Sequence, residues 1–168
     1  MNRFREKVCL VTGGASGIGA KTAEMFVDQG GKVAVCDVDD ALGNEIAAEI
    51  VAASGGDNAI FVHTDVSDPD ACQGAIDQTV SKFGSVDCVL NSAIKMAPGM
   101  LKDLALEDWN SMISVGLTGT FLMTQAAGRW MIDNGRPGSI VTMSSIGGVQ
   151  PYGMSGAYST VKAAVIML

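Results

Sequence analysis

"VCLVTGGASGIG", residues 8–19, is the stretch that decides the fold of this chain. It opens with four apolar residues, as a strand buried on both faces of a parallel sheet would. Gly13, Gly17 and Gly19 then permit a tight turn, and a helical stretch follows. A turn of this kind lets the backbone approach a diphosphate at a helix N-terminus, where free amides and the helix dipole favour negative charge. A purely structural turn would also explain the glycines on their own.

The rest of the chain repeats the alternation of apolar run and helix. Leu42, Ile46 and Ile50 mark one helix face, and "SDPD" (67–70) predicts a helix that Ser67 caps and Gly84 ends. This pattern predicts an α/β fold with a doubly wound parallel sheet in one domain, residues 1–168, with ligands bound at the edge where the strands end. The four further apolar runs are 32–38, 59–66, 86–93 and 139–145.

Composition excludes several classes of protein. Of 168 residues, 48% are apolar and 17% charged, which is typical of a globular chain. The net charge of −7 and the absence of a basic cluster argue against nucleic acid or an anionic membrane as partner. The apolar start "VCLV" is too short for a signal peptide or a membrane span, so we expect a cytoplasmic protein.

Cysteine and histidine usage argues against a metal site. Cys9, Cys36, Cys72 and Cys88 are scattered without a CxxC pair, and His63 is the only histidine. We therefore expect reduced core cysteines and no bound metal.

Acidic residues follow the second and third apolar runs. Asp37 lies twenty residues after Gly17, where a carboxylate accepts hydrogen bonds from ribose hydroxyls and repels a 2′-phosphate. With Ser16 in the loop and Val38 after the acid, this favours NAD over NADP, although a solvated turn carboxylate would have the same sequence. Asp65 and Val66 suit an adenine ring, or Asp65 simply starts a turn.

A tyrosine and a lysine one helical turn apart, Tyr158 and Lys162, point to acid–base chemistry. This spacing puts both side chains on one helix face. A phenol has an ordinary pKa of about 10 and is a poor base at neutral pH, but a nearby ammonium favours the phenolate. Ser145, at the end of the fifth run, would hold a substrate oxygen while Tyr158 exchanges its proton. The pair alone is weak evidence, and its combination with the serine and the loop makes it specific.

Together these residues resemble the short-chain dehydrogenase/reductase family over the whole chain. TGGASGIG matches the family's T-G-x-x-x-G-I-G loop, and Asp37 matches its NAD-selecting acid. Asp65 and Val66 match its adenine contact, while Ser145, Tyr158 and Lys162 match its catalytic Ser, Tyr and Lys.

The resemblance implies a strand order of 3-2-1-4-5 and hydride exchange between NAD and an alcohol or carbonyl. In the oxidation direction, Tyr158 would take the hydroxyl proton and Ser145 would orient that oxygen. Lys162 would favour the phenolate and bind the nicotinamide ribose. The cofactor-binding residues expected are Gly13, Ser16, Gly17, Ile18, Gly19, Asp37, Asp65, Val66, Asn91, Ala93, Tyr158 and Lys162.

Departures from the family pattern bear on activity. The family's N-N-A-G reads "NSAI" at 91–94, and Asn91 would contact either the cofactor or the neighbouring strand. Gly116 stands where the family has an Asn that steadies a water in the proton relay. Either the relay is weakened, or Gly116 and Gly119 let helices pack closely and another group carries the proton. Relatives also continue further, so we expect this chain to lack about the C-terminal third and to end within the Tyr–Lys helix.

The sequence therefore predicts an NAD-dependent oxidoreductase of secondary alcohols or ketones, and it leaves two alternatives open. One is a catalytically weak NAD-binding or scaffold relative, and the other is a nucleoside-binding enzyme such as a methyltransferase. An apolar or cyclic substrate is expected from residues predicted to border the pocket: Met96, Met100, Gln150, Pro151, Tyr152 and Met154. The helical stretch 109–131 is apolar on more than one face, which predicts a homodimer or homotetramer.

Overall fold

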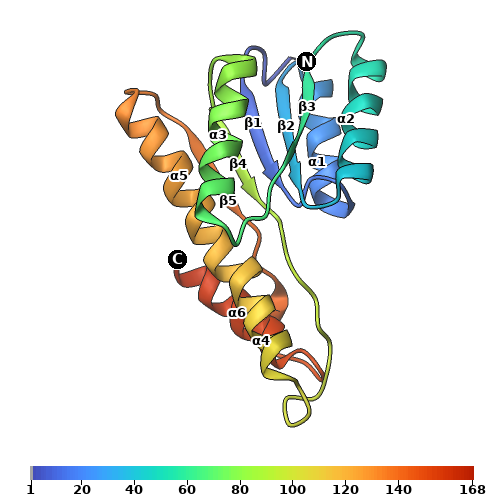
Figure 1. Cartoon of the computed structure of the whole chain (residues 1–168), viewed down its shortest axis with the longest axis vertical. Helices are drawn as coiled ribbons and strands as arrows, with labels where there is room; N and C mark the ends of the chain where they lie inside the picture. Colours follow the sequence, from blue (N-terminus) through green and yellow to red (C-terminus); the bar gives the residue numbers. More distant parts are fainter. Residues whose placement is uncertain (1) are drawn as a thin grey trace.

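A computed structural model describes residues 2–168 and shows one five-stranded parallel sheet (Figure 1). The strand order β3-β2-β1-β4-β5 confirms the predicted doubly wound topology. Each strand is shorter than its apolar run, because the last residues of the run form the loops at the carboxyl edge, and β4 also begins two residues after the start of its run. The strands are β1 (Val8–Thr12), β2 (Lys32–Asp37), β3 (Ala59–His63), β4 (Cys88–Asn91) and β5 (Ser139–Thr142).

Helices cover both faces of the sheet. The helices α1 and α2 pack on one face and α3 and α5 on the other, as Figure 1 shows. A π-helical turn, η1 (Ser114–Thr118), makes α4 and α5 into one continuous rod, and a short 3-10 turn, η2 (Ile146–Gly148), follows β5. The α-helices are α1 (Gly17–Asp28), α2 (Asp40–Ser54), α3 (Pro69–Phe83), α4 (Leu106–Ile113), α5 (Gly119–Asp133) and α6 (Gly156–Met167).

The central strand β1 is buried along its whole length, as its apolar sequence predicts. Leu10 packs with Ile76 and Met123 from the α3–α5 layer. Its neighbour Val11 packs with Phe26 from the α1–α2 layer. Successive side chains of a strand point to opposite faces, so a strand between two helical layers must be apolar throughout.

The expected cap of α3 is wrong by one residue. Asp68 is the N-cap, and its carboxylate accepts a hydrogen bond from the N–H of Asp70 at 2.8 Å. Ser67 instead donates its hydroxyl to Asp65, at 2.7 Å. The other end is as predicted, because Gly84 takes the left-handed conformation with φ 82°.

The four cysteines are free thiols that pack in or beside the core. Burial raises the pKa of Cys36 to about 12 and that of Cys72 to about 11, because desolvation disfavours the thiolate. These thiols are therefore unreactive core groups. Within residues 2–168, no helix has both the length and the apolar composition needed to cross a membrane.

A second, smaller cluster lies beyond the sheet. Met112, Ala157 and Val161 form its buried centre, where α4 and α6 meet. Figure 1 shows this lower part, with the long segment between β4 and α4 running down beside α6. This cluster holds α6 next to the carboxyl edge of the sheet.

Candidate active site

Gly13 and Gly19 of the loop after β1 stand in close contacts that leave no room for a side chain at either position. A Cβ on Gly19 would lie 2.1 Å from the carbonyl oxygen of Gly13. Gly13 itself, with φ 63°, lies against the backbone of Ala93 after β4. The N-cap of α1, Ser16, makes no side-chain capping bond, so it leaves the first amides of the helix available for an anion.

Asp37 fixes this loop to the end of β2. Its carboxylate accepts hydrogen bonds from the N–H groups of Ala15 at 3.0 Å and Val38 at 2.8 Å. The side chain is only partly buried and borders the cavity described below, so it also has room to accept ribose hydroxyls. The interpretation of Asp37 as a solvated turn residue is therefore incomplete, because the carboxylate also organises the loop.

The end of β3 supplies Asp65 and Val66 to the same cavity. Asp65 accepts hydrogen bonds from the N–H and the hydroxyl of Ser67, so it does start a turn, as the local alternative held. Val66 is buried and packs on the core. The two readings of Asp65 are compatible, since a turn carboxylate can still face a ligand.

The segment after β4 explains one departure from the family pattern. Asn91 does not border the cavity, and its amide donates to the Thr124 hydroxyl on α5, at 3.0 Å, as a bracing residue would. Ser92 donates its hydroxyl to the carbonyl oxygen of Thr12 at 2.5 Å and so ties β4 to β1. The serine thus has a structural role of its own, while Ala93 borders the cavity as expected.

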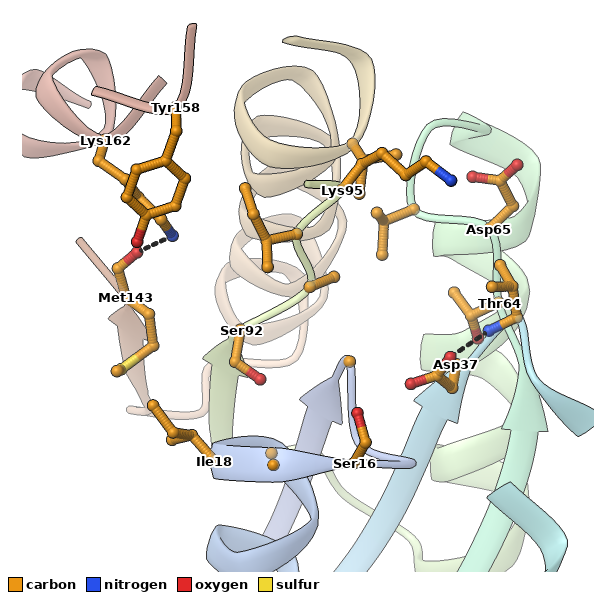
Figure 2. A pocket seen from close by; sticks show the side chains of 18 of the residues that line it. Ser16, Ile18, Asp37, Thr64, Asp65, Ser92, Lys95, Met143, Tyr158 and Lys162 are labelled. Atoms are coloured by element: carbon orange, nitrogen blue, oxygen red, sulfur yellow. Dashed lines mark hydrogen bonds between the residues drawn. The ribbon is translucent and has the colours of Figure 1, made fainter. Parts of the chain in front are cut away.

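Tyr158 and Lys162 lie on the face of α6 that borders the cavity (Figure 2). The Lys162 ammonium lies 5.9 Å from the centroid of the Tyr158 ring and donates to the carbonyl oxygen of Met143 at 2.5 Å. Lys162 is only 6% exposed, and burial lowers its pKa because desolvation disfavours the ammonium. The predicted pairing on one helix face is therefore confirmed.

Ser145 lies just outside the residues that border the cavity, whereas its neighbour Ser144 borders it. The Ser145 hydroxyl oxygen accepts a hydrogen bond from the N–H of Gly147 at 3.1 Å and keeps its own hydrogen to donate. Ser144 donates to the carbonyl oxygen of Lys162 at 2.7 Å. That bond joins the end of β5 to α6. Ser145 thus stabilises a local turn, whereas Ser144 fixes the helix to the strand.

All of these elements enclose one cavity of about 440 Å³, a size that suits a small ligand. Figure 2 shows Ser16 and Ile18 at one wall, Asp37 and Asp65 at one end, and Tyr158 and Lys162 at the other. Sequence reasoning assigned no role in the site to several residues that border it: Thr64, Lys95, Val115, Met143 and Ser144. Thr64, Met143 and Ser144 follow the rule that strand ends face the site, but nothing local marks Lys95 or Val115.

The six residues expected to border the substrate pocket do not line this cavity: Met96, Met100, Gln150, Pro151, Tyr152 and Met154. They belong to two loops that meet beyond α6, where the N–H of Gly99 donates to the carbonyl oxygen of Met154. Their side chains are exposed. The loops pair with each other instead of folding over the cavity.

The family model described as "short chain dehydrogenase" matches residues 7–168. Among curated proteins, a 2,5-dichloro-2,5-cyclohexadiene-1,4-diol dehydrogenase of Sphingobium indicum is 39% identical over 98% of this chain and 64% of its own length. Secoisolariciresinol dehydrogenase of Forsythia intermedia is 39% identical over 99% of this chain and 59% of its own. A trans-4-hydroxycyclohexanecarboxylate dehydrogenase of Sinomonas cyclohexanicum is 35% identical over 96% of this chain and 63% of its own length.

Solved structures show the same fold. An NAD⁺-bound xylitol dehydrogenase superposes with a TM-score of 0.92 and 31% identity over 98% of this chain and 63% of its own. A short-chain type dehydrogenase/reductase from Mycobacterium marinum superposes with a TM-score of 0.91 and 34% identity, over 98% of this chain and 66% of its own. The chain therefore spans 64% or less of the length of the curated relatives named above.

Proposed function

Because the chain belongs to the short-chain dehydrogenase family, we propose that it is an NAD-dependent oxidoreductase of secondary alcohols or their ketones. The proposal is supported by one observation: Tyr158 and Lys162 border the same cavity as the glycine-rich loop and Asp37. An acid–base pair therefore lies in the same cavity as the residues proposed to bind the dinucleotide. The relatives named above are dehydrogenases, which does not favour a non-catalytic scaffold.

The residues fit a nicotinamide dinucleotide. Free amides at the start of α1 suit a diphosphate, and the Gly13–Gly19 contact keeps that surface free of side chains. Asp37 would accept hydrogen bonds from the ribose hydroxyls, and Asp65 with Val66 would contact the adenine, since all three border the cavity. When bound, the nicotinamide supplies the hydride chemistry.

The protein's own groups would handle the proton. Tyr158 takes the proton of the substrate hydroxyl in oxidation and returns it in reduction. Lys162 stabilises the phenolate through its charge and is itself fixed by the Met143 carbonyl. Ser145 holds the substrate oxygen with the hydrogen that its turn leaves free.

Asp37 sets the choice of cofactor in this account. Asp37→Asn should lower the ratio of NADP to NAD dissociation constants about 10–100-fold, because a carboxylate facing a 2′-phosphate costs several kcal/mol. Titration calorimetry with both cofactors measures the ratio. Asp39→Asn is the matched control, since it removes a neighbouring charge outside the cavity and keeps a capping side chain on α2. Tighter binding of NADP than NAD by the unaltered protein would contradict the assignment.

Lys95 should contribute to binding of the negatively charged cofactor. It is an exposed cation that borders the cavity, and Figure 2 shows it extending across the opening towards Asp65. We expect Lys95→Ala to raise the dissociation constant of NAD about 2–5-fold at low salt and to have no effect at high salt, because exposed charges are weakly coupled and screened. Lys102→Ala, which removes a lysine paired with Asp103 on the same segment, should change nothing. A Lys95→Ala effect that is independent of salt would refute this role.

The substrate class follows from the apolar side chains near Tyr158. Ile94 and Met143 border the cavity, and an apolar ring with a secondary hydroxyl would satisfy both them and the Tyr158 phenol. Two of the relatives named above are dehydrogenases of six-membered ring alcohols by name. A cyclic secondary alcohol is therefore the first substrate to test.

The homodimer or homotetramer expected from the apolar helical stretch 109–131 stays a prediction.

A further inference from the structure

We propose that Ile94 and Gly116 form an interlocking pair that positions α6, and with it Tyr158 and Lys162, against the cavity. The effect of this pair on catalysis rests on the proposed function. Ile94 is a positioning residue, because it acts on the proton-transfer step through α6.

Gly116 provides the space that the pair needs. It is buried in the π-helical turn η1, between α4 and α5. A Cβ at this position would lie 2.7 Å from the Cδ1 of Ile94 and 2.7 Å from the Cγ1 of Val161. Real Cβ atoms do not approach other atoms this closely, so the position accepts only glycine unless a neighbour moves. One methyl group from the β4–α4 segment and one from α6 fill the gap.

Ile94 has a second side that faces the site. It borders the cavity together with Tyr158 and Lys162. It also packs on the cluster of Met112, Ala157 and Val161, to which Tyr158 itself is packed. Ile94 is thus in contact with both the ligand cavity and the helix that carries the acid–base pair.

The two neighbours of Gly116 differ in how easily they can move. Val161 is fully buried on α6, and a β-branched side chain on a helix has one strongly preferred rotamer. The Cδ1 of Ile94 is the far end of a flexible side chain. An added methyl group at position 116 must therefore displace the end of the Ile94 side chain and also move Val161, with α6, away from η1. The movement of α6 disturbs Tyr158.

The same contact supports one of the two alternatives for Gly116, close packing, and bears on how an asparagine would fit there. An asparagine at Gly116 cannot simply restore a polar group, because its Cβ alone meets two methyl groups. The alternative that Gly116 and Gly119 serve close packing is supported, since a Cβ on Gly119 would lie 2.6 Å from the Cγ2 of Val66.

A double-mutant cycle tests the pair, because Ile94→Val removes the Cδ1 methyl group that meets position 116. Gly116→Ala alone should lower Tm by roughly 2–10 °C and kcat by about 10–100-fold, from overpacking and misplacement of Tyr158. Ile94→Val alone should lower Tm by roughly 1–5 °C. The double variant should lose less Tm than the sum of the two single losses and recover part of the kcat lost in Gly116→Ala, because the contact with Val161 remains. Gly128→Ala on α5, where a Cβ meets nothing within 4 Å, should raise Tm.

A spectroscopic readout separates this proposal from the proposed function. The chain has two tyrosines, Tyr152 and Tyr158, so fluorotyrosine labelling gives two ¹⁹F signals that Tyr152→Phe assigns. The Tyr158 signal should shift in Gly116→Ala and return towards its original position in the double variant. This holds even if no tested alcohol is turned over, an outcome that would count against the proposed function alone. Additive losses of Tm, or an unmoved Tyr158 signal in Gly116→Ala, would overturn the pair.

Discussion

Tyr158→Phe should lower kcat about 10²–10⁴-fold and leave the dissociation constant of NAD almost unchanged. The substitution keeps the ring, which packs on the cluster between α4 and α6, and removes the phenol hydroxyl of the ring that lies 5.9 Å from the Lys162 ammonium. The glycine-rich loop, Asp37 and Lys162 remain, so the groups proposed to hold the cofactor are intact. Steady-state kinetics and titration calorimetry on the same preparation give the two values.

Tyr152→Phe is the matched control for this experiment. Tyr152 is 56% exposed and lies outside the cavity, so its variant should keep the activity of the unaltered protein. The pH dependence of kcat for alcohol oxidation provides a further check. A base must be unprotonated to take the hydroxyl proton, so the acidic limb of the profile should move or vanish only in Tyr158→Phe. Full activity of Tyr158→Phe would refute the mechanism whatever the fold.

Gly19→Ala should weaken NAD binding by about 10–100-fold or more. The added Cβ would lie 2.1 Å from the carbonyl oxygen of Gly13, and backbone cannot move aside as the end of a flexible side chain can. The loop must open to accept the methyl group, at a cost typical of overpacking, about 1–3 kcal/mol. The amides at the start of α1 then lose their arrangement around the diphosphate.

Gly74→Ala on α3 separates this effect from a general response to alanine. A Cβ at position 74 meets nothing within 4 Å, so the protein should bind NAD unchanged and gain stability. Calorimetry measures binding, and thermal unfolding shows whether Gly19→Ala still folds. A folded Gly19→Ala variant that binds NAD as tightly as the unaltered protein would show that the loop is not the cradle.

The sequence predicts the architecture well because the signals are local. A strand buried on both faces has to be apolar throughout, and five such runs separated by helices specify a parallel sheet. The carboxyl ends of those strands then gather Gly19, Asp37 and Asp65 at one edge. The shared helix face of Tyr158 and Lys162 was predictable from their spacing, because helix geometry fixes their relation, and the glycine-rich loop with Ser145 made the pair specific.

Features that depend on contacts between distant segments were missed or misplaced. The contact among Ile94, Gly116 and Val161 joins three segments, and no local pattern marks it. The exposed loops that carry Met100 and Met154 were expected at the cavity because their position after a strand allows it. In the structure the two loops instead pair with each other beyond α6, through the hydrogen bond from the N–H of Gly99 to the carbonyl oxygen of Met154.

The most direct test of the account follows the transferred hydrogen itself. The protein is mixed with NAD and a cyclic secondary alcohol that carries deuterium on its carbinol carbon, and the reduced cofactor is examined by mass spectrometry. The account predicts that deuterium appears in the reduced cofactor and that this transfer falls about 10²–10⁴-fold in Tyr158→Phe. Transfer that continues undiminished in Tyr158→Phe, or deuterium released to water instead of to the cofactor, would contradict it.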